Sequence, residues 1–72
     1  MTSTRRELIA VLTEISELAP DFRFGQLVTN FSFAARGQND SATWDVEDDE
    51  LLGAAKEYLD VKRRMTVSAA ER

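Results

Sequence analysis

Hydrophobic residues in the first third of the chain recur every three or four positions, which is the spacing of one face of an α-helix. This first stripe is made of Leu8, Val11, Leu12, Ile15, Leu18 and Ala19. Thr4 and Glu7 have the spacing of a capping box, in which each side chain accepts a hydrogen bond from a free amide at the helix start. Pro20 disfavours helical geometry at the residue before it. The pattern predicts a helix over residues 4–19.

A second hydrophobic stripe follows the proline and is made of Phe24, Leu27, Val28, Phe31 and Ala35. Asp21 is a favourable N-cap residue, and Gly37 lies where the periodic pattern stops. Gly25 and the aromatic and β-branched residues of this segment are weak helix formers, so tertiary packing must hold it in place. The pattern predicts a helix over residues 22–36.

The third stripe lies further along the chain and is made of Leu51, Leu52, Ala55, Tyr58, Leu59 and Met65. Asp45 is placed to cap a helix here. Acidic residues open the segment and basic residues close it, and both oppose the helix macrodipole favourably. The acidic group is Glu47, Asp48, Asp49 and Glu50, and the basic group is Lys62, Arg63 and Arg64. The pattern predicts a helix over residues 46–64.

Three helices with no strand pattern between them predict an all-α fold, arranged as a three-helix bundle. A chain of 72 residues has room for one domain. We expect that domain to cover residues 1–72, with an ordered core over 4–64 and a flexible tail over 66–72. Trp44 is expected to be buried, as a clamp that holds the loop before the third helix against the core.

The residue types that carry most enzymatic chemistry are missing. Histidine and cysteine are absent, which removes the usual general base, the usual nucleophiles and most transition-metal ligands. The three glycines are isolated, so no phosphate-binding loop is present. Counted as an EF-hand loop from Asp45, the sequence has Glu50 where glycine is needed and Lys56 where a bidentate glutamate is needed. We therefore predict no catalytic residue, no cofactor, no metal site and no small-molecule substrate.

A net charge of −4 disfavours nucleic-acid binding, because phosphate repels an acidic surface. The alternative stays open, since the first two predicted helices and the tight turn between them resemble the start of a helix-turn-helix, and Lys62, Arg63 and Arg64 form a basic end. No segment approaches the ~20 apolar residues of a transmembrane helix, and the N-terminus lacks a secretory pattern. We expect a cytoplasmic protein with no membrane partner.

Two features indicate a surface for a protein partner. Arg23, Gln26, Asn30 and Phe33 share one face of the second predicted helix, opposite its apolar stripe. That face is either a solvated surface or a binding strip. Five of the six aromatic residues fall within residues 22–44, so Phe33 or Trp44 either packs inside or contributes to an interface. We expect a non-enzymatic protein–protein interaction module that self-associates or binds another protein, with nucleic-acid binding as the alternative.

Two segments carry a resemblance to other proteins. They are Arg23-Phe24-Gly25-Gln26-Leu27 and Trp44-Asp45-Val46-Glu47-Asp48. In this combination the chain resembles a group of small bacterial proteins of unassigned function. The resemblance implies no activity and no cofactor. It does imply that Arg23, Gln26, Asn30, Trp44 and Asp45 belong to one recurring set of residues, whether that set is structural or functional.

Overall fold

The computed structural model describes the backbone of residues 1–70 and the side chains of residues 1–65. It contains the helices α1 (Ser3–Leu18), α2 (Phe24–Arg36), α3 (Ala42–Asp45) and α4 (Asp48–Ala70). Since the described backbone contains no strand, the predicted all-α class is confirmed. The short helix α3 was not predicted, and α4 runs past the predicted end at Arg64. The tail predicted over 66–72 lies outside the residues whose side chains are described.

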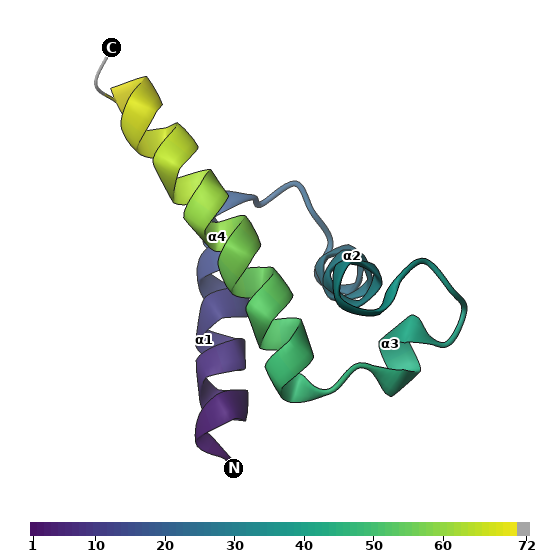
Figure 1. The fold of residues 1–72 in the computed structure, drawn as a ribbon. Coiled ribbons are helices and arrows are strands. Elements are labelled where there is room, and N and C mark those ends of the chain that lie inside the picture. Colours follow the sequence, from purple (N-terminus) through teal and green to yellow (C-terminus); the bar gives the residue numbers. More distant parts are fainter. Residues whose placement is uncertain (71–72) are drawn as a thin grey trace.

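Helix α4 is the centre of the fold, since α1 and α2 both pack against it and α3 packs against α2 (Figure 1). Ion pairs join Arg5 to Asp48 and Glu14 to Arg63. The residue numbers of these pairs rise together along the two helices, so α1 and α4 run side by side in the same direction. Helix α2 is seen end-on in Figure 1 and crosses the other two. The three long helices therefore do not lie alongside one another as in the simple three-helix bundle we predicted. The chain between α2 and α4, which was predicted to be a loop, contains the short helix α3.

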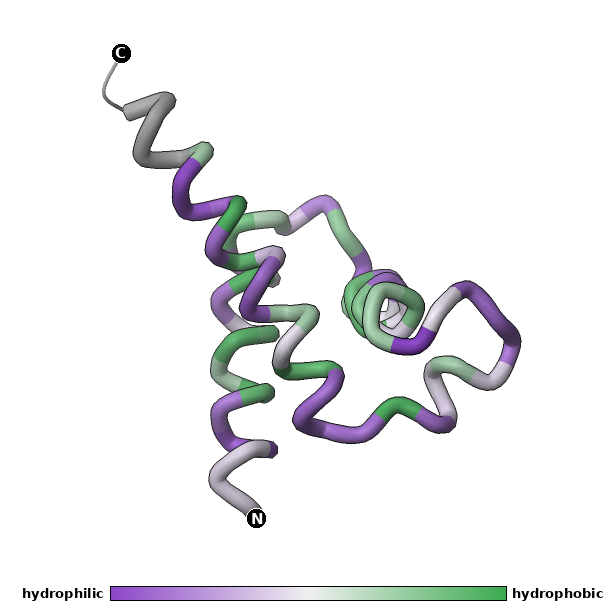
Figure 2. Tube along the Cα trace, in the orientation of Figure 1, coloured by the Kyte–Doolittle hydropathy of each residue, from purple (hydrophilic) through white to green (hydrophobic). Residues whose placement is uncertain are grey.

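The core is built from the predicted stripes. Hydrophobic positions recur turn by turn along α1 and α4 (Figure 2), and their buried members form one cluster with those of α2. That cluster is Leu8, Leu12, Ile15, Leu27, Phe31, Leu51, Ala55 and Leu59. Three other members of the predicted stripes, Leu18, Phe24 and Met65, are exposed. Leu18 and Phe24 are the terminal residues of α1 and α2, where a helical face extends beyond its neighbour.

The start of α1 differs from the predicted capping box. Thr2 is the N-cap, and its Oγ1 accepts a hydrogen bond from the Arg5 amide at 3.2 Å. The Glu7 carboxylate does not fold back on the helix start but accepts from Lys56 Nζ at 2.9 Å. The predicted cap at Thr4 is therefore wrong, because the helix starts one residue earlier and α4 offers Glu7 a cationic partner.

The starts of α2 and α4 also differ from prediction. Asp21 lies in the turn before α2, and the Arg23 amide at the helix start donates instead to Gln26 Oε1 at 2.9 Å. Asp45 is the last residue of α3 rather than the cap of α4. At the start of α4 the Glu47 amide donates to Glu50 Oε1 at 3.0 Å. In both helices a side chain within the first turn caps the start, so the aspartate before the helix is not needed.

Candidate protein-interaction surface

Trp44 projects from the surface on α3, with 91% of its area exposed. The predicted clamp on the core is therefore wrong. The reason lies in the helical register of α3: Ala42 is 1% exposed and anchors the helix. Each helical residue is rotated by about 100°, so Trp44, two positions on, points away from that anchor. Burying Ala42 forces the tryptophan into solvent.

The loop that carries α3 is held by its own hydrogen bonds. Asn39 Oδ1 accepts from the Ser41 amide at 3.1 Å and from the Ser41 hydroxyl at 2.9 Å. The Asn39 carbonyl accepts from the Ala42 amide at 3.2 Å. These contacts form an Asx-type turn directly before the helix. Trp44 is thus presented on an ordered turn of helix.

Three of the four predicted residues of the polar strip lie on α2, Arg23 is its N-cap, and the four occupy two different environments. Arg23, Gln26 and Asn30 are exposed, whereas Phe33 is half-buried. Gln26 has a structural task, because its side-chain oxygen caps the start of α2. Asn30 lines a groove between α2 and α4. No hydrogen bond or ring contact joins Trp44 to these four residues within the part of the chain whose side chains are described.

The groove between α2 and α4 is a feature that sequence analysis missed. It is shallow and open, and predominantly apolar. Phe31 lies at its floor, and the Phe31 ring packs on the ring of Tyr58. Four of the other lining residues are small, and they come from both helices: Ala34 and Ala35 from α2, Gly53 and Ala54 from α4. Recognising the groove required knowing that α2 packs on α4.

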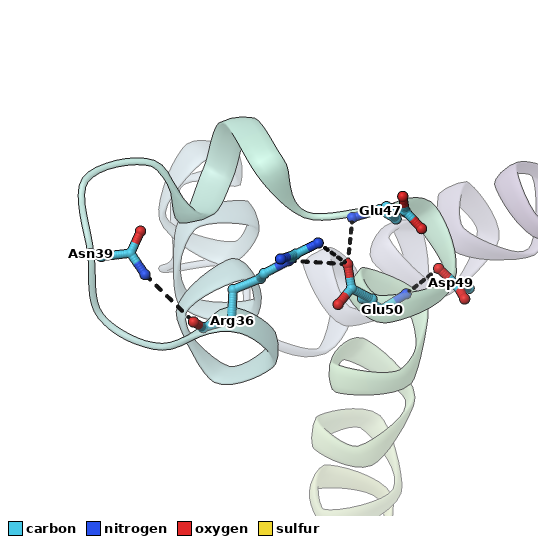
Figure 3. A network of polar contacts seen from close by, with 5 residues as sticks. All are labelled: Arg36, Asn39, Glu47, Asp49 and Glu50. Atoms are coloured by element: carbon cyan, nitrogen blue, oxygen red, sulfur yellow. Dashed lines mark hydrogen bonds and ion pairs between the residues drawn. The ribbon is translucent and has the colours of Figure 1, made fainter.

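The two helices that form the groove are tied together at one end. The Arg36 side chain extends from the last turn of α2 to the first turn of α4 (Figure 3). There it donates to Glu50 Oε1 from Nε at 3.2 Å and approaches it with Nη2 at 3.1 Å. The same oxygen accepts a hydrogen bond from the Glu47 amide. Glu50 therefore has two roles: it lies at the end of the groove and it caps α4. The contact with Arg36 joins α2 and α4 at one end of the groove.

Gly53 provides the open space on the α4 side of the groove. A Cβ atom built on Gly53 would meet no atom within 4 Å, and the residue lies inside a helix. A helical interior glycine destabilises a helix by about 0.5–1 kcal/mol relative to alanine. Neither backbone conformation nor crowding within the described fold requires glycine at this position. Two glycines, Gly25 and Gly53, lie inside predicted helices, and only Gly53 lines the groove, so the sequence signal for the groove was weak.

Arg63 of the predicted basic end and Arg36 in the last turn of α2 are both engaged within the fold. Arg36 pairs with Glu50, and Arg63 pairs with Glu14. Both contacts join neighbouring helices, so these side chains also serve packing. The acidic run does not collect into a metal site either. Within the described side chains, no three acidic residues are grouped in a way that could hold a metal ion.

No described helix combines the length and the apolar character needed to cross a membrane. Comparison with known proteins found no matching family, no similar curated protein and no similar solved structure. The resemblance to small bacterial proteins that was seen in the sequence stays a prediction. The assignment of function therefore depends on the surfaces described above.

Proposed function

We propose that this protein is a non-enzymatic protein–protein interaction module whose partner is a second copy of itself or another protein. The observation that carries the proposal is the 91% exposure of Trp44 on an ordered helical turn. A tryptophan in solvent contributes nothing to the core, yet its large apolar surface gains free energy when a partner covers it. Tryptophan is also enriched among the residues that dominate protein interfaces.

Further exposed groups extend the proposed surface beyond Trp44. Phe24 is 57% exposed at the start of α2, next to Arg23 and close to Gln26 in the sequence. Asn30 reaches the groove between α2 and α4. We assign Arg23, Gln26, Asn30, Phe33 and Trp44 to partner binding. Phe33 has the smallest share in this assignment, because it is half-buried and has less area to offer.

Protein binding is favoured over nucleic-acid binding by the charge distribution. The nucleic-acid alternative depends on α2 and on the basic end at Lys62, Arg63 and Arg64. Arg63 is paired with Glu14 and Arg36 with Glu50, which lowers the positive charge available for phosphate. With a net charge of −4, the remaining field repels a polyanion. A salt-dependent shift with nonspecific DNA or RNA is the observation that would favour this alternative.

Site-specific photo-crosslinking tests the proposal. A photoreactive phenylalanine analogue replaces Trp44 in one variant and Ala10 in a control, because Ala10 is exposed on α1. We expect protein adducts, either with a second copy or with another protein, from position 44 and not from position 10. Equal adducts from both positions, or adducts with nucleic acid only, would contradict the proposal. Sedimentation over a hundredfold concentration range then identifies or excludes the second copy.

A further inference from the structure

We infer that the groove between α2 and α4 receives a cationic amphipathic helix of a protein partner. The inference rests on the proposed function and adds a location and a chemistry to it. The helix would lay an apolar stripe along Ala34, Gly53 and Ala54, and it would place a lysine or arginine against Glu57. All four residues line the groove.

The shape of the groove suits a helix. Two helices pack with their axes about 8–10 Å apart, and the distance shortens when the contact residues are small. The groove has small residues on both sides, with Ala34 on α2 and Gly53 and Ala54 on α4. Its floor is firm, since the rings of Phe31 and Tyr58 have centroids 5.4 Å apart. A third helix can therefore approach both walls closely.

Gly53 favours a binding groove over an accidental hollow, because it lies inside α4 and lines the groove. Gly25 has open space too, but it lies in the first turn of α2 and does not line the groove. The fold is more stable with alanine than with glycine at an open helical position. At Gly53 a Cβ atom has free space, so the glycine is a defect of the isolated chain. Close approach of a partner helix would explain the glycine, because even the methyl group of an alanine at position 53 would keep the partner backbone further away.

The charge around the groove selects the kind of helix. Glu50 and Glu57 line it, and no described cationic side chain does. Glu50 is already bonded to Arg36, whereas the Glu57 carboxylate makes no hydrogen bond or ion pair with any side chain that the structure describes. An unpaired carboxylate beside apolar surface favours a cationic group in the occupant. A second copy is the weaker candidate, because both chains would carry a net charge of −4.

A model peptide tests the inference directly. The probe is a fluorescently labelled helix of about five turns, with leucine and alanine along one stripe and lysine on both flanks. Its counterpart has glutamate in place of every lysine. Fluorescence anisotropy is recorded with the full chain at about 0.15 M salt, where long-range attraction is screened. We expect binding of the lysine peptide and none of the glutamate peptide.

Variants of the protein locate the site. Gly53→Leu fills the groove without changing charge, and we expect it to weaken binding about tenfold or more. Ala10→Leu adds the same side chain on the exposed face of α1 and should leave binding within about twofold. Glu57→Gln removes the carboxylate and should weaken binding roughly threefold, whereas Glu17→Gln removes an exposed charge on α1 and should have little effect. Thermal melts confirm that each variant is folded.

Four results would overturn the inference. Binding that is absent, or that Gly53→Leu and Ala10→Leu reduce alike, excludes the groove. Equal binding of both peptides excludes the cationic partner. A concentration-dependent dimer that Gly53→Leu abolishes assigns the groove to a second copy instead. If the peptide fails while crosslinking at position 44 succeeds, the proposed function stands and only the groove assignment is lost.

Discussion

Phe31 and Tyr58 join α2 to α4 through their rings, whose centroids are 5.4 Å apart and whose planes are inclined by 54°. This tilted arrangement suits the ring quadrupoles better than a face-to-face stack. Phe31 is 5% exposed, and its ring also forms the floor of the groove between the two helices. The stability of α2 and the shape of the candidate site therefore depend on the same contact.

Phe31→Ala should destabilise the protein by about 3–5 kcal/mol, because it removes buried surface and leaves a cavity. Phe24→Ala is the matched control, since Phe24 is exposed on the same helix and its truncation should change the free energy of unfolding by less than about 0.5 kcal/mol. Far-ultraviolet circular dichroism during urea unfolding measures both. Equal losses in the two variants would show that the apolar face of α2 is not where the structure places it.

Trp44→Ala should leave the free energy of unfolding unchanged within about 0.5 kcal/mol, because the side chain is in solvent. The wild-type protein should also fluoresce close to the wavelength of free tryptophan in water. Urea unfolding should shift that emission only slightly. A blue-shifted native spectrum in dilute solution, together with a large loss of stability in the alanine variant, would mean that Trp44 is buried.

Substitution of two glycines by alanine should have opposite effects. Gly53→Ala should stabilise the protein by roughly 0.5–1 kcal/mol, because the new Cβ meets no atom within 4 Å and alanine favours the helix. Gly37→Ala should destabilise it by about 1–3 kcal/mol, since Gly37 ends α2 with a φ of 91° that an L side chain rarely adopts. Thermal melts monitored by circular dichroism compare the two. A destabilising Gly53→Ala would mean that the fold itself needs this glycine.

Glu50→Ala should destabilise the protein by about 1–2 kcal/mol, because one carboxylate oxygen caps α4 at the Glu47 amide and also pairs with Arg36. Glu50→Gln keeps an oxygen for the amide and should cost less than half as much. Asp45→Ala is the control and should be neutral, since Asp45 is an exposed end residue of α3. If Asp45→Ala were the most damaging of the three, Asp45 would cap a helix that begins at residue 46, as the sequence predicted.

The sequence by itself determined the three long helices and most of the core. Every member of the core cluster lies on a stripe that the spacing of apolar residues predicts. The reason is physical. In water, a helix of this length is stabilised mainly by burying one apolar face, so apolar residues must recur in the sequence about every 3.6 positions. The end of α1 before Pro20 follows in the same way from a local steric clash.

Tertiary structure decided which faces are covered and where each helix begins. Period alone places Leu27 and Phe24 on the same face, but only packing against α4 buries the first and leaves the second exposed. A local pattern likewise cannot choose between Thr2 and Thr4 as the N-cap of α1. Glu7, which was predicted to join the cap, instead accepts a hydrogen bond from Lys56, 49 residues away.

The candidate site was the least predictable part. Trp44 is exposed because the burial of Ala42 sets the orientation of α3. A helix of four residues is too short to show a hydrophobic period in the sequence. The groove exists only because α2 packs on α4, which places Ala34 of one helix and Gly53 of the other along the same exposed hollow. Helical period is a local property, whereas a groove is a relation between two helices, so only the tertiary structure could decide it.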